Sequence, residues 1–310
     1  MIICCGEALI DMLPRQSSDG DDVFLPVPGG AIFNTAIGLG RLGEPAGFVS
    51  GLSTDMFGDQ LVEALQHSRV DTSLAIRSDR PTTLAFVRLT DGHATYSFFD
   101  ENSAGRMVRV EDLPDLPDGV EALHFGAISL IPEPCGSAYE ALMQRHAGDA
   151  VISLDPNIRP GFITDEMAHR ARMERMVALS DIVKVSDEDL DWLAPDRSAE
   201  ETIKAWLAEG CAIVLITRGA EGVDVHTRQS AFQVAARKVD VVDTVGAGDT
   251  FNAGLLAGLR RAGHLKKIAL ATISEQNLRP AVDLAVRVAA HVVGQAGANP
   301  PWQEELDADT

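Results

Sequence analysis

The sequence predicts an α/β fold: a mostly parallel sheet with helices on both faces and a small second β-sheet. From about residue 45 onward, short apolar runs rich in β-branched residues alternate with longer segments of helical period. This rhythm is typical of βα repeats around a parallel sheet. A two-residue period replaces it within residues 74–99. We therefore expect residues 1–310 to form a single domain that carries a small appended sheet.

The expected parallel strands are short and apolar, and they lie at residues 47–50, 122–126, 151–154, 182–185 and 212–216. Apolar residues at helical spacing predict helices between them, at residues 59–66, 137–145, 168–179 and 199–208. The order of these elements predicts several βα units in succession, and no linker or internal repeat interrupts them.

The appended sheet is predicted from a hairpin signal. Residues 84–89 and 94–99 alternate and flank Asp91-Gly92, a dipeptide that favours a two-residue turn. Together with residues 11–28, the segment 74–108 is expected to form this sheet. Tyr96, Phe98 and Phe99 cluster in it, which predicts packing against a bound ligand or a partner subunit.

Charge and composition narrow the class of protein. Asp and Glu outnumber Lys and Arg by 46 to 26, giving a net charge of −20, which disfavours binding to nucleic acid or anionic membranes. No run approaches 18 apolar residues, and Glu7 and Asp11 break the first apolar run, so we expect neither a membrane span nor a secretory signal. The 4 cysteines show no metal-binding spacing. A cytoplasmic protein is expected.

The most informative motif is the segment 243–254, Asp-Thr-Val-Gly-Ala-Gly-Asp-Thr-Phe-Asn-Ala-Gly. Val239, Val241 and Val242 before it predict an extended run, and a helical pattern follows. Small residues at a helix N-terminus expose backbone N–H groups that hold anions such as phosphate. Asp249 in the first turn is then placed to accept a proton from an attacking hydroxyl. The alternative is a glycine-rich turn with a helix-stabilising aspartate.

Polar residues also follow several predicted strands. Asp155 and Arg159 come after one strand end, Ser186 after the next and Thr217 after a third, while Asp249 opens a helix. Ligands of open α/β sheets bind beyond the carboxyl ends of the strands. These residues are therefore expected to share one site.

The sequence excludes two other common nucleotide-binding motifs. Residues 38–43 satisfy G-x-G-x-x-G but lie inside a helical pattern and follow no strand, which excludes the dinucleotide fingerprint. The sequence also contains no G-x-x-x-x-G-K-[ST], which removes the P-loop route.

The motif at 243–256 resembles the C-terminal signature of the ribokinase-type (PfkB) family of carbohydrate kinases. The Gly29-Gly30…Asn34 run resembles the family's N-terminal signature, although Ile32 and Phe33 stand where small residues or proline are common. Residues 6–11, 155–160 and 217–219 match in the same order, so the resemblance spans essentially the whole chain. It implies a ribokinase-like fold, with the appended sheet as a lid and a homodimer surface, and the ATP- and Mg²⁺-dependent phosphorylation of a sugar hydroxyl.

The resemblance also implies roles for single residues. Asp249 would be the general base, with the backbone of Gly246, Ala247 and Gly248 holding the phosphoryl oxygens. The residues expected to bind the sugar are Asp11, Gly30, Asn34, Phe98, Arg159 and Asp249. Those expected on the nucleotide side are Ser186, Thr217, Gly219, Gly222, Gly246, Gly248 and Asn277.

Two metal sites are implied. Asp189 or Glu188 would organise Mg²⁺ through water; Asp189 stands where the family carries a longer glutamate, which leaves the choice between them open. The main chain of five residues matches positions that bind a monovalent cation such as K⁺ in the family: Asp243, Val245, Val292, Gln295 and Gly297. Pro301 replaces a hydroxyl ligand there, so dependence on K⁺ stays open.

Within the family, the chain looks most like fructokinases and 2-keto-3-deoxygluconate kinases. A sugar acid requires a cationic partner, yet Asp100 stands where relatives often carry arginine, and Arg106 is the nearest substitute. Fructose is therefore the favoured substrate, with 2-keto-3-deoxygluconate or a nucleoside as alternatives. A non-catalytic, sugar-sensing relative is the hypothesis from a different class.

Overall fold

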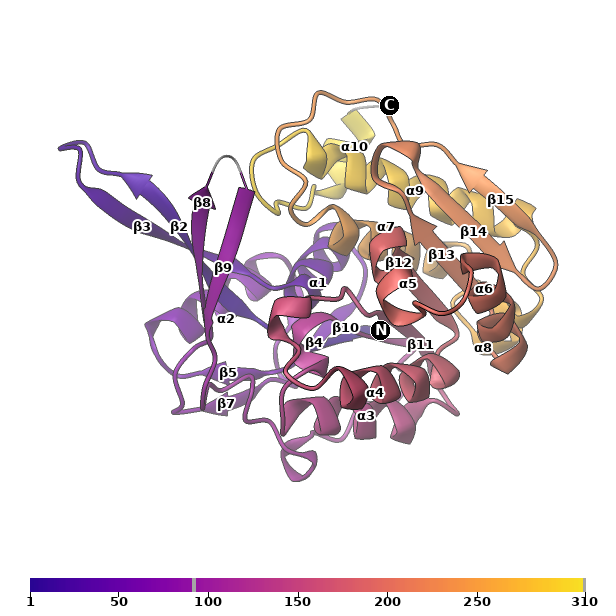
Figure 1. Ribbon diagram of the computed structural model, residues 1–310, viewed down its shortest axis with the longest axis horizontal. Coiled ribbons are helices and arrows are strands. Elements are labelled where there is room, and N and C mark those ends of the chain that lie inside the picture. The colour runs from indigo at the N-terminus through magenta and orange to yellow at the C-terminus, as the bar shows by residue number, and fades with distance from the viewer. Residues whose placement is uncertain (91–92, 309–310) are drawn as a thin grey trace.

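The computed structural model describes residues 1–90 and 93–308. In that part of the chain, the main sheet has nine strands in the order β15-β14-β13-β12-β11-β10-β1-β4-β6 (Figure 1). Seven neighbouring strands of this sheet are parallel, namely β13, β12, β11, β10, β1, β4 and β6. The other two, β14 and β15, run antiparallel to their neighbours. Their bounds are β1 Ile2–Cys5, β4 Ala46–Val49, β6 Val70–Asp71, β10 Ala122–Gly126, β11 Val151–Asp155, β12 Ile182–Ser186, β13 Ile213–Thr217, β14 Val223–Thr227 and β15 Ala231–Val234. The predicted mostly parallel sheet is confirmed.

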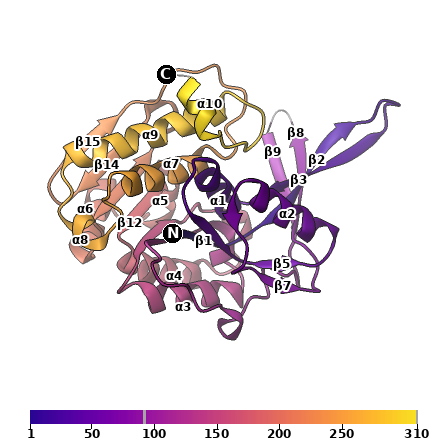
Figure 2. The ribbon, with the colours of Figure 1, turned by 180° about the vertical axis from the view of Figure 1, so that it is seen from behind.

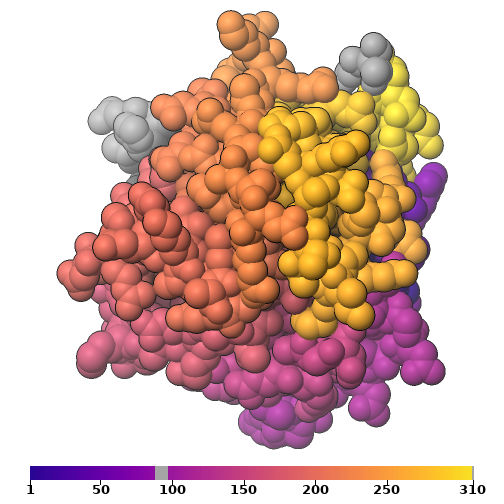
Figure 3. Space-filling view, turned by 90° about the vertical axis from the view of Figure 1, so that its right-hand side faces the viewer, coloured from indigo at the N-terminus to yellow at the C-terminus, as the bar shows by residue number. Residues whose placement is uncertain are grey.

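The parallel strands are continuous apolar runs because helices cover both of their faces. Every residue of β1, β4, β10 and β11 is buried. In β14, by contrast, buried and half-buried residues alternate, as a strand near the sheet's edge requires. On that side of the molecule the later half of the chain forms most of the surface (Figure 3). The five predicted strands correspond to β4, β10, β11, β12 and β13, each within one residue at either end.

The helices form one layer on each face of the sheet (Figures 1 and 2). Ile2 and Cys4 point into one apolar cluster with α1, α2, α7 and α9, while Ile3 and Cys5 point into another with α3, α4 and α6. The helices are α1 Ala31–Arg41, α2 Met56–His67, α3 Cys135–His146, α4 Glu166–Leu179, α5 Asp187–Leu193, α6 Ala199–Glu209, α7 Ala247–Arg261, α8 Lys267–Ala271, α9 Glu275–Val293 and α10 Gln303–Ala308. Short 3₁₀ turns are η1 Val110–Asp112, η2 Ala127–Leu130, η3 Pro160–Phe162 and η4 Gly219–Glu221.

A second, four-stranded sheet has the order β3-β2-β8-β9, and its β2–β3 hairpin projects from the body of the molecule (Figure 1). We call it the small sheet. Its strands are β2 Leu9–Gln16, β3 Asp22–Gly29, β8 Leu84–Thr90 and β9 His93–Phe99. The last two pair in antiparallel register, as the hairpin prediction requires. The predicted turn residues, Asp91 and Gly92, lie outside the described residues.

The small sheet was expected to comprise residues 11–28 and 74–108. The second of these segments was predicted too long, because within it only β8 and β9 belong to this sheet. β7 Ile76–Ser78 pairs instead with β5 Gly51–Ser53 in a separate two-stranded sheet. Ser103, Ala104 and Val108 are buried but form no strand, and Val108 belongs to an apolar cluster of the main sheet. A two-residue period shows that a strand forms, but not which sheet it joins, and that is why the estimate was too wide.

The extended run expected before residue 243 is also wrong. Residues 235–246 contain no strand, and Val241 and Val242 are exposed. The N–H groups of Val242 and Asp243 donate to the carbonyl of Val293 at the end of α9 (2.9 and 3.3 Å). β-branched residues favour extended backbone, but pairing with a neighbouring strand decides whether a strand forms.

The excluded glycine motif at 38–43 lies in and just after α1, as expected. A methyl group on Gly38 would lie 2.8 Å from Ala253 Cβ, and one on Gly40 would lie 2.0 Å from the Ser68 carbonyl oxygen. These glycines therefore allow close packing of α1 against its neighbours. Among the described residues, none of the helices is long and apolar enough to span a membrane.

Candidate active site

A cavity of about 1140 Å³ opens at the carboxyl edge of the main sheet, between that edge and the small sheet. Every residue predicted to bind the sugar lines it, together with two of the predicted anion-binding glycines: Asp11, Gly30, Asn34, Phe98, Arg159, Asp249, Gly246 and Gly248. Of the residues expected to share one site, Arg159 and Asp249 line this cavity, whereas Asp155, Ser186 and Thr217 are not among its lining residues.

The backbone predicted to bind an anion lies at the N-terminus of α7. Gly246 caps the helix with φ 79°, a left-handed conformation that favours glycine, and a methyl group there would lie 2.5 Å from Ala298 Cβ. Ala247 departs from expectation, because its N–H group donates to the Thr244 carbonyl (3.3 Å). Gly246 and Gly248 line the cavity.

Asp249 lies in the first turn of α7 with only 8% of its surface exposed. Its Oδ2 accepts a hydrogen bond from Asn34 Nδ2 at 2.9 Å. Burial raises the pKa of Asp249 to about 7, and the Asp155 carboxylate acts in the same direction. A carboxyl group with its pKa near neutrality, facing a cavity, suits a general base.

The Gly29-Gly30 pair brings Asp11 and α1 together. A methyl group on Gly29 would lie 2.3 Å from Asp11 Oδ2, and Gly30 has φ 112°. Burial raises the pKa of Asp11 to about 6. Glu7 Oε1 accepts from the N–H of Ala31 (2.8 Å), so this carboxylate caps α1. No role for Glu7 was predicted from the sequence, although an acidic residue two positions after a buried strand was a signal for one.

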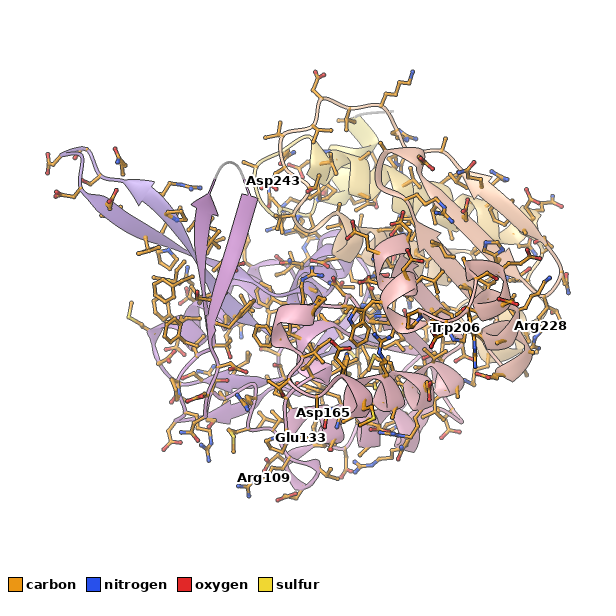
Figure 4. All side chains as sticks on the ribbon, in the orientation of Figure 1. Arg109, Glu133, Asp165, Trp206, Arg228 and Asp243 are labelled. Atoms are coloured by element: carbon orange, nitrogen blue, oxygen red, sulfur yellow. The ribbon has the colours of Figure 1, made fainter. Side chains whose placement is uncertain are left out.

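Aromatic and cationic side chains form the outer part of the cavity. Phe98 from β9 packs edge-on against Phe162 (ring centroids 4.1 Å apart), which joins the small sheet to the segment after β11. Arg159 donates to the Ile158 carbonyl (3.0 Å) and lines the cavity. Glu133 and Asp165 border the same cavity near the N-terminus of α4 (Figure 4).

A buried charge network lies beneath α7, and the sequence analysis did not find it. Lys184 from β12 forms an ion pair with Asp155 (Nζ to Oδ2, 2.9 Å), and Asn252 donates to the same oxygen (2.7 Å). Burial opposes the charge on Lys184, but the carboxylates of Asp155, Asp189 and Asp249 together outweigh this and raise the pKa of Lys184 above its usual range. A lysine inside an otherwise apolar strand, Ile182–Ser186, was the signal available in the sequence.

Four of the expected nucleotide-side residues lie at or just after the ends of β12 and β13: Ser186, Thr217, Gly219 and Gly222. Ser186 and Thr217 are direct partners in the register of these strands. Gly222 has φ 104°, and a methyl group there would lie 2.1 Å from the Val234 carbonyl oxygen. Gly219 opens η4 between β13 and β14, while Asn277 is exposed in the first turn of α9.

The two candidates for the magnesium shell differ in environment. Asp189 is buried, and its carboxylate accepts from the N–H of Ile158 (2.9 Å) and of Ser186 (3.4 Å). Glu188 is exposed on the first turn of α5. The described residues contain no cluster of three or more His, Cys, Asp or Glu that could hold a metal on its own.

The residues of the expected monovalent-cation site do come together. Asp243 accepts from the N–H of Val245 (3.0 Å) and of Gly297 (2.9 Å). Its carboxylate therefore joins the loop before α7 (Figure 4) to the loop after α9. Gln295 donates from its backbone to the Val292 carbonyl (2.9 Å) in that second loop.

The family model described as pfkB family carbohydrate kinase matches residues 1–305. The chain belongs to this family. The resemblance drawn from the two signatures and the predicted ribokinase-like fold are confirmed, because solved structures of family members superimpose over nearly the whole chain.

Relatives of this pfkB kinase include proteins described as fructokinases. A fructokinase of Rhizobium leguminosarum bv. trifolii is 56% identical over 283 residues, 91% of this chain and 87% of the relative. The structure of a Xylella fastidiosa fructokinase with bound ATP has a TM-score of 0.90 at 30% identity and covers 99% of this chain and 98% of its own. A double-mutant fructokinase of Vibrio cholerae O395, bound to fructose, ADP and potassium, has a TM-score of 0.84 at 27% identity, with 99% and 97% covered.

Proposed function

We propose that this pfkB kinase transfers the γ-phosphoryl group of ATP to a hydroxyl group of fructose. The observation that carries the proposal is the position of Asp249: its carboxylate lies at the opening of α7, in the same cavity as Asp11, Asn34 and Arg159. The fructokinase relatives support fructose as the acceptor.

In this reaction Asp249 accepts the proton of the attacking hydroxyl group. The sugar oxygen bonds to the γ-phosphorus while the bond to the ADP oxygen breaks. Asp11, Asn34 and the Gly30 backbone orient the sugar, and the Gly246 and Gly248 backbone faces the phosphoryl group. Ser186, Thr217, Gly219, Gly222 and Asn277 are proposed for the nucleotide.

Fructose is favoured over a sugar acid by an ion pair in the cavity wall. Arg106 is bound to Asp100 (3.3 Å), so its charge is already partly neutralised. The carboxylate of 2-keto-3-deoxygluconate would compete with Asp100 for this arginine. A neutral ketose meets no such competition.

Two cations are proposed to accompany the substrates. Mg²⁺ would enter with ATP and neutralise phosphate charge, held chiefly by the phosphates and water, with Asp189 or Glu188 organising the water shell. K⁺ would bind between the loops that Asp243 joins.

The small sheet is proposed to act as a lid and as a homodimer surface. Phe98 of this sheet lines the cavity and contacts Phe162, which supports the role as a lid. The small sheet also exposes apolar side chains, which supports the role as a dimer surface: Val23, Phe24, Leu25 and Phe99. Sedimentation at several concentrations would detect the dimer. Phe24→Ser should shift it to monomer, whereas Ile268→Ser, which replaces an apolar and even more exposed side chain on α8, should not.

A coupled assay of ADP release tests the function. The purified enzyme, with ATP and Mg²⁺, is given fructose, 2-keto-3-deoxygluconate, ribose and nucleosides in turn. We expect the highest kcat/KM with fructose. A higher value with another acceptor would refute fructose, and sugar binding by calorimetry without ADP release from any acceptor would favour a sugar sensor.

A further inference from the structure

The structure assigns Lys184 a direct part in the reaction: we propose that its ammonium group contacts the phosphoryl group in transfer. This inference rests on the proposed function, because it takes phosphoryl transfer to occur at the opening of α7. Neither sequence signature of the family includes this lysine.

The position of the ammonium group is fixed by its distance to Gly248. A methyl group built on Gly248 would lie 2.9 Å from Lys184 Nζ. Lys184 and Gly248 line the same cavity as Asp249. The charge therefore lies over the first turn of α7, where the exposed backbone faces an anion.

The lysine is held by Asp155, which is in turn held by a residue of α7. Asp155 Oδ2 accepts from Lys184 Nζ (2.9 Å) and from Asn252 Nδ2 (2.7 Å), and Asn252 belongs to α7 itself. Only 5% of Lys184 is exposed, so its side chain has little freedom. A charge fixed before the reaction needs no reorganisation during it.

The surrounding charge explains why a cation is needed at this place. Asp155, Asp189 and Asp249 all lie close enough to Lys184 to affect its pKa. An incoming phosphoryl group adds negative charge to this acidic site, and that charge spreads over its equatorial oxygens in the transition state. Lys184 stays protonated throughout, while Asp249 takes the hydroxyl proton.

The alternative is that Lys184 only neutralises Asp155. Two variants separate these roles: Lys184→Met, and the double variant Lys184→Met/Asp155→Asn, which removes both partners of the ion pair. Lys204→Met, on the exposed face of α6, is the matched control. If Lys184 contacts the phosphoryl group, kcat falls by about 10²–10³ in both Lys184 variants and is unchanged in the control.

A second measurement uses binding in place of turnover. Fructose, MgADP and aluminium fluoride together mimic the phosphoryl group in transfer, and we expect this mixture to inhibit the wild type tightly. Both Lys184 variants should bind fructose and MgADP as the wild type does, measured by calorimetry, yet lose the tight inhibition. Circular dichroism and thermal melting establish that each variant is folded, and the double variant carries the test if the single variant is unfolded.

Recovery of wild-type kcat by the double variant would overturn the inference, because Lys184 would then act only on Asp155. Unchanged inhibition by aluminium fluoride would overturn it as well. If the wild type phosphorylates fructose and the Lys184 variants do so with the same kcat, this inference is refuted and the proposed function stands. If the wild type phosphorylates no acceptor, the proposed function itself is refuted.

Discussion

Asn34 Nδ2 donates a hydrogen bond to Asp249 Oδ2 over 2.9 Å, which joins two residues 215 positions apart. Thr35, the next residue, donates through Oγ1 to the backbone carbonyl of Asp249 (3.0 Å). These two hydrogen bonds therefore hold the first turn of α1 against the first turn of α7. A sugar bound against Asn34 is brought to the proposed base by the same contact.

Asp249→Asn should lower kcat by about 10²–10⁴, the usual range for a positioned acid–base group. Asparagine keeps the shape and can still accept from Asn34, so fructose affinity should change little. Steady-state kinetics and calorimetry measure the two effects. Asp283→Asn on α9 is a control that should behave as the wild type. A loss of affinity without a loss of kcat would contradict the assignment of Asp249 as the base.

The pH dependence of kcat/KM should report the carboxyl group of Asp249. Because its pKa is about 7 in the free enzyme and only the ionised form accepts a proton, kcat/KM should rise with pH and level off above about 7. The hydrogen bond from Asn34 lowers this pKa, so Asn34→Ala should move the rise to higher pH. A rise that moved to lower pH would exclude Asp249 as its origin.

Asp249 should also destabilise the folded chain at alkaline pH. Its pKa is raised by folding from an ordinary value of 3.8 to about 7, so the folded state binds the proton more tightly. The contribution of Asp249 to the free energy of unfolding is therefore fully present at pH values below its unfolded pKa. This contribution is lost as the pH rises through its folded pKa. Thermal melting should show Asp249→Asn several degrees more stable than the wild type at about pH 8, with a smaller difference at about pH 5. Equal differences at both values would contradict the raised pKa.

Gly248→Ala should abolish most activity while leaving the chain folded. The added methyl group would lie 2.9 Å from Lys184 Nζ, so it would displace the ammonium group from its position against the first turn of α7. We expect a fall in kcat of at least about 10² and a small change in melting temperature. Gly148→Ala is the matched control, because a methyl group there meets no atom within 4 Å.

Asp243→Ala should remove activation by K⁺. The substitution deletes the carboxylate that accepts from Val245 and Gly297, so the loops around the proposed cation site lose their connection. Titrating KCl into an assay kept at constant ionic strength with tetramethylammonium chloride measures the effect. Asp240→Ala, in the exposed part of the same loop, should retain the wild-type response. A wild type insensitive to K⁺ would refute the site.

The element types were predictable because local patterns determine them. The apolar runs at 122–126, 151–155 and 182–186 must be covered on both faces, which makes a central parallel sheet the natural result. The extended run at 239–242 failed as a prediction because strand formation there needed a partner strand. For the same reason, β7 could not be assigned to a sheet from its sequence.

By itself the sequence determined the family and the helix that Asp249 opens, because each depends on a short local pattern of residue types. Only the tertiary structure decided which side chains meet. Lys184 and Asp155 come from neighbouring strands, and Asn252 reaches them from α7, so no local pattern could predict the ion pair. The pKa of Asp249 was likewise beyond the sequence, because burial and the approach of Asn34, Asp155 and Lys184 set it.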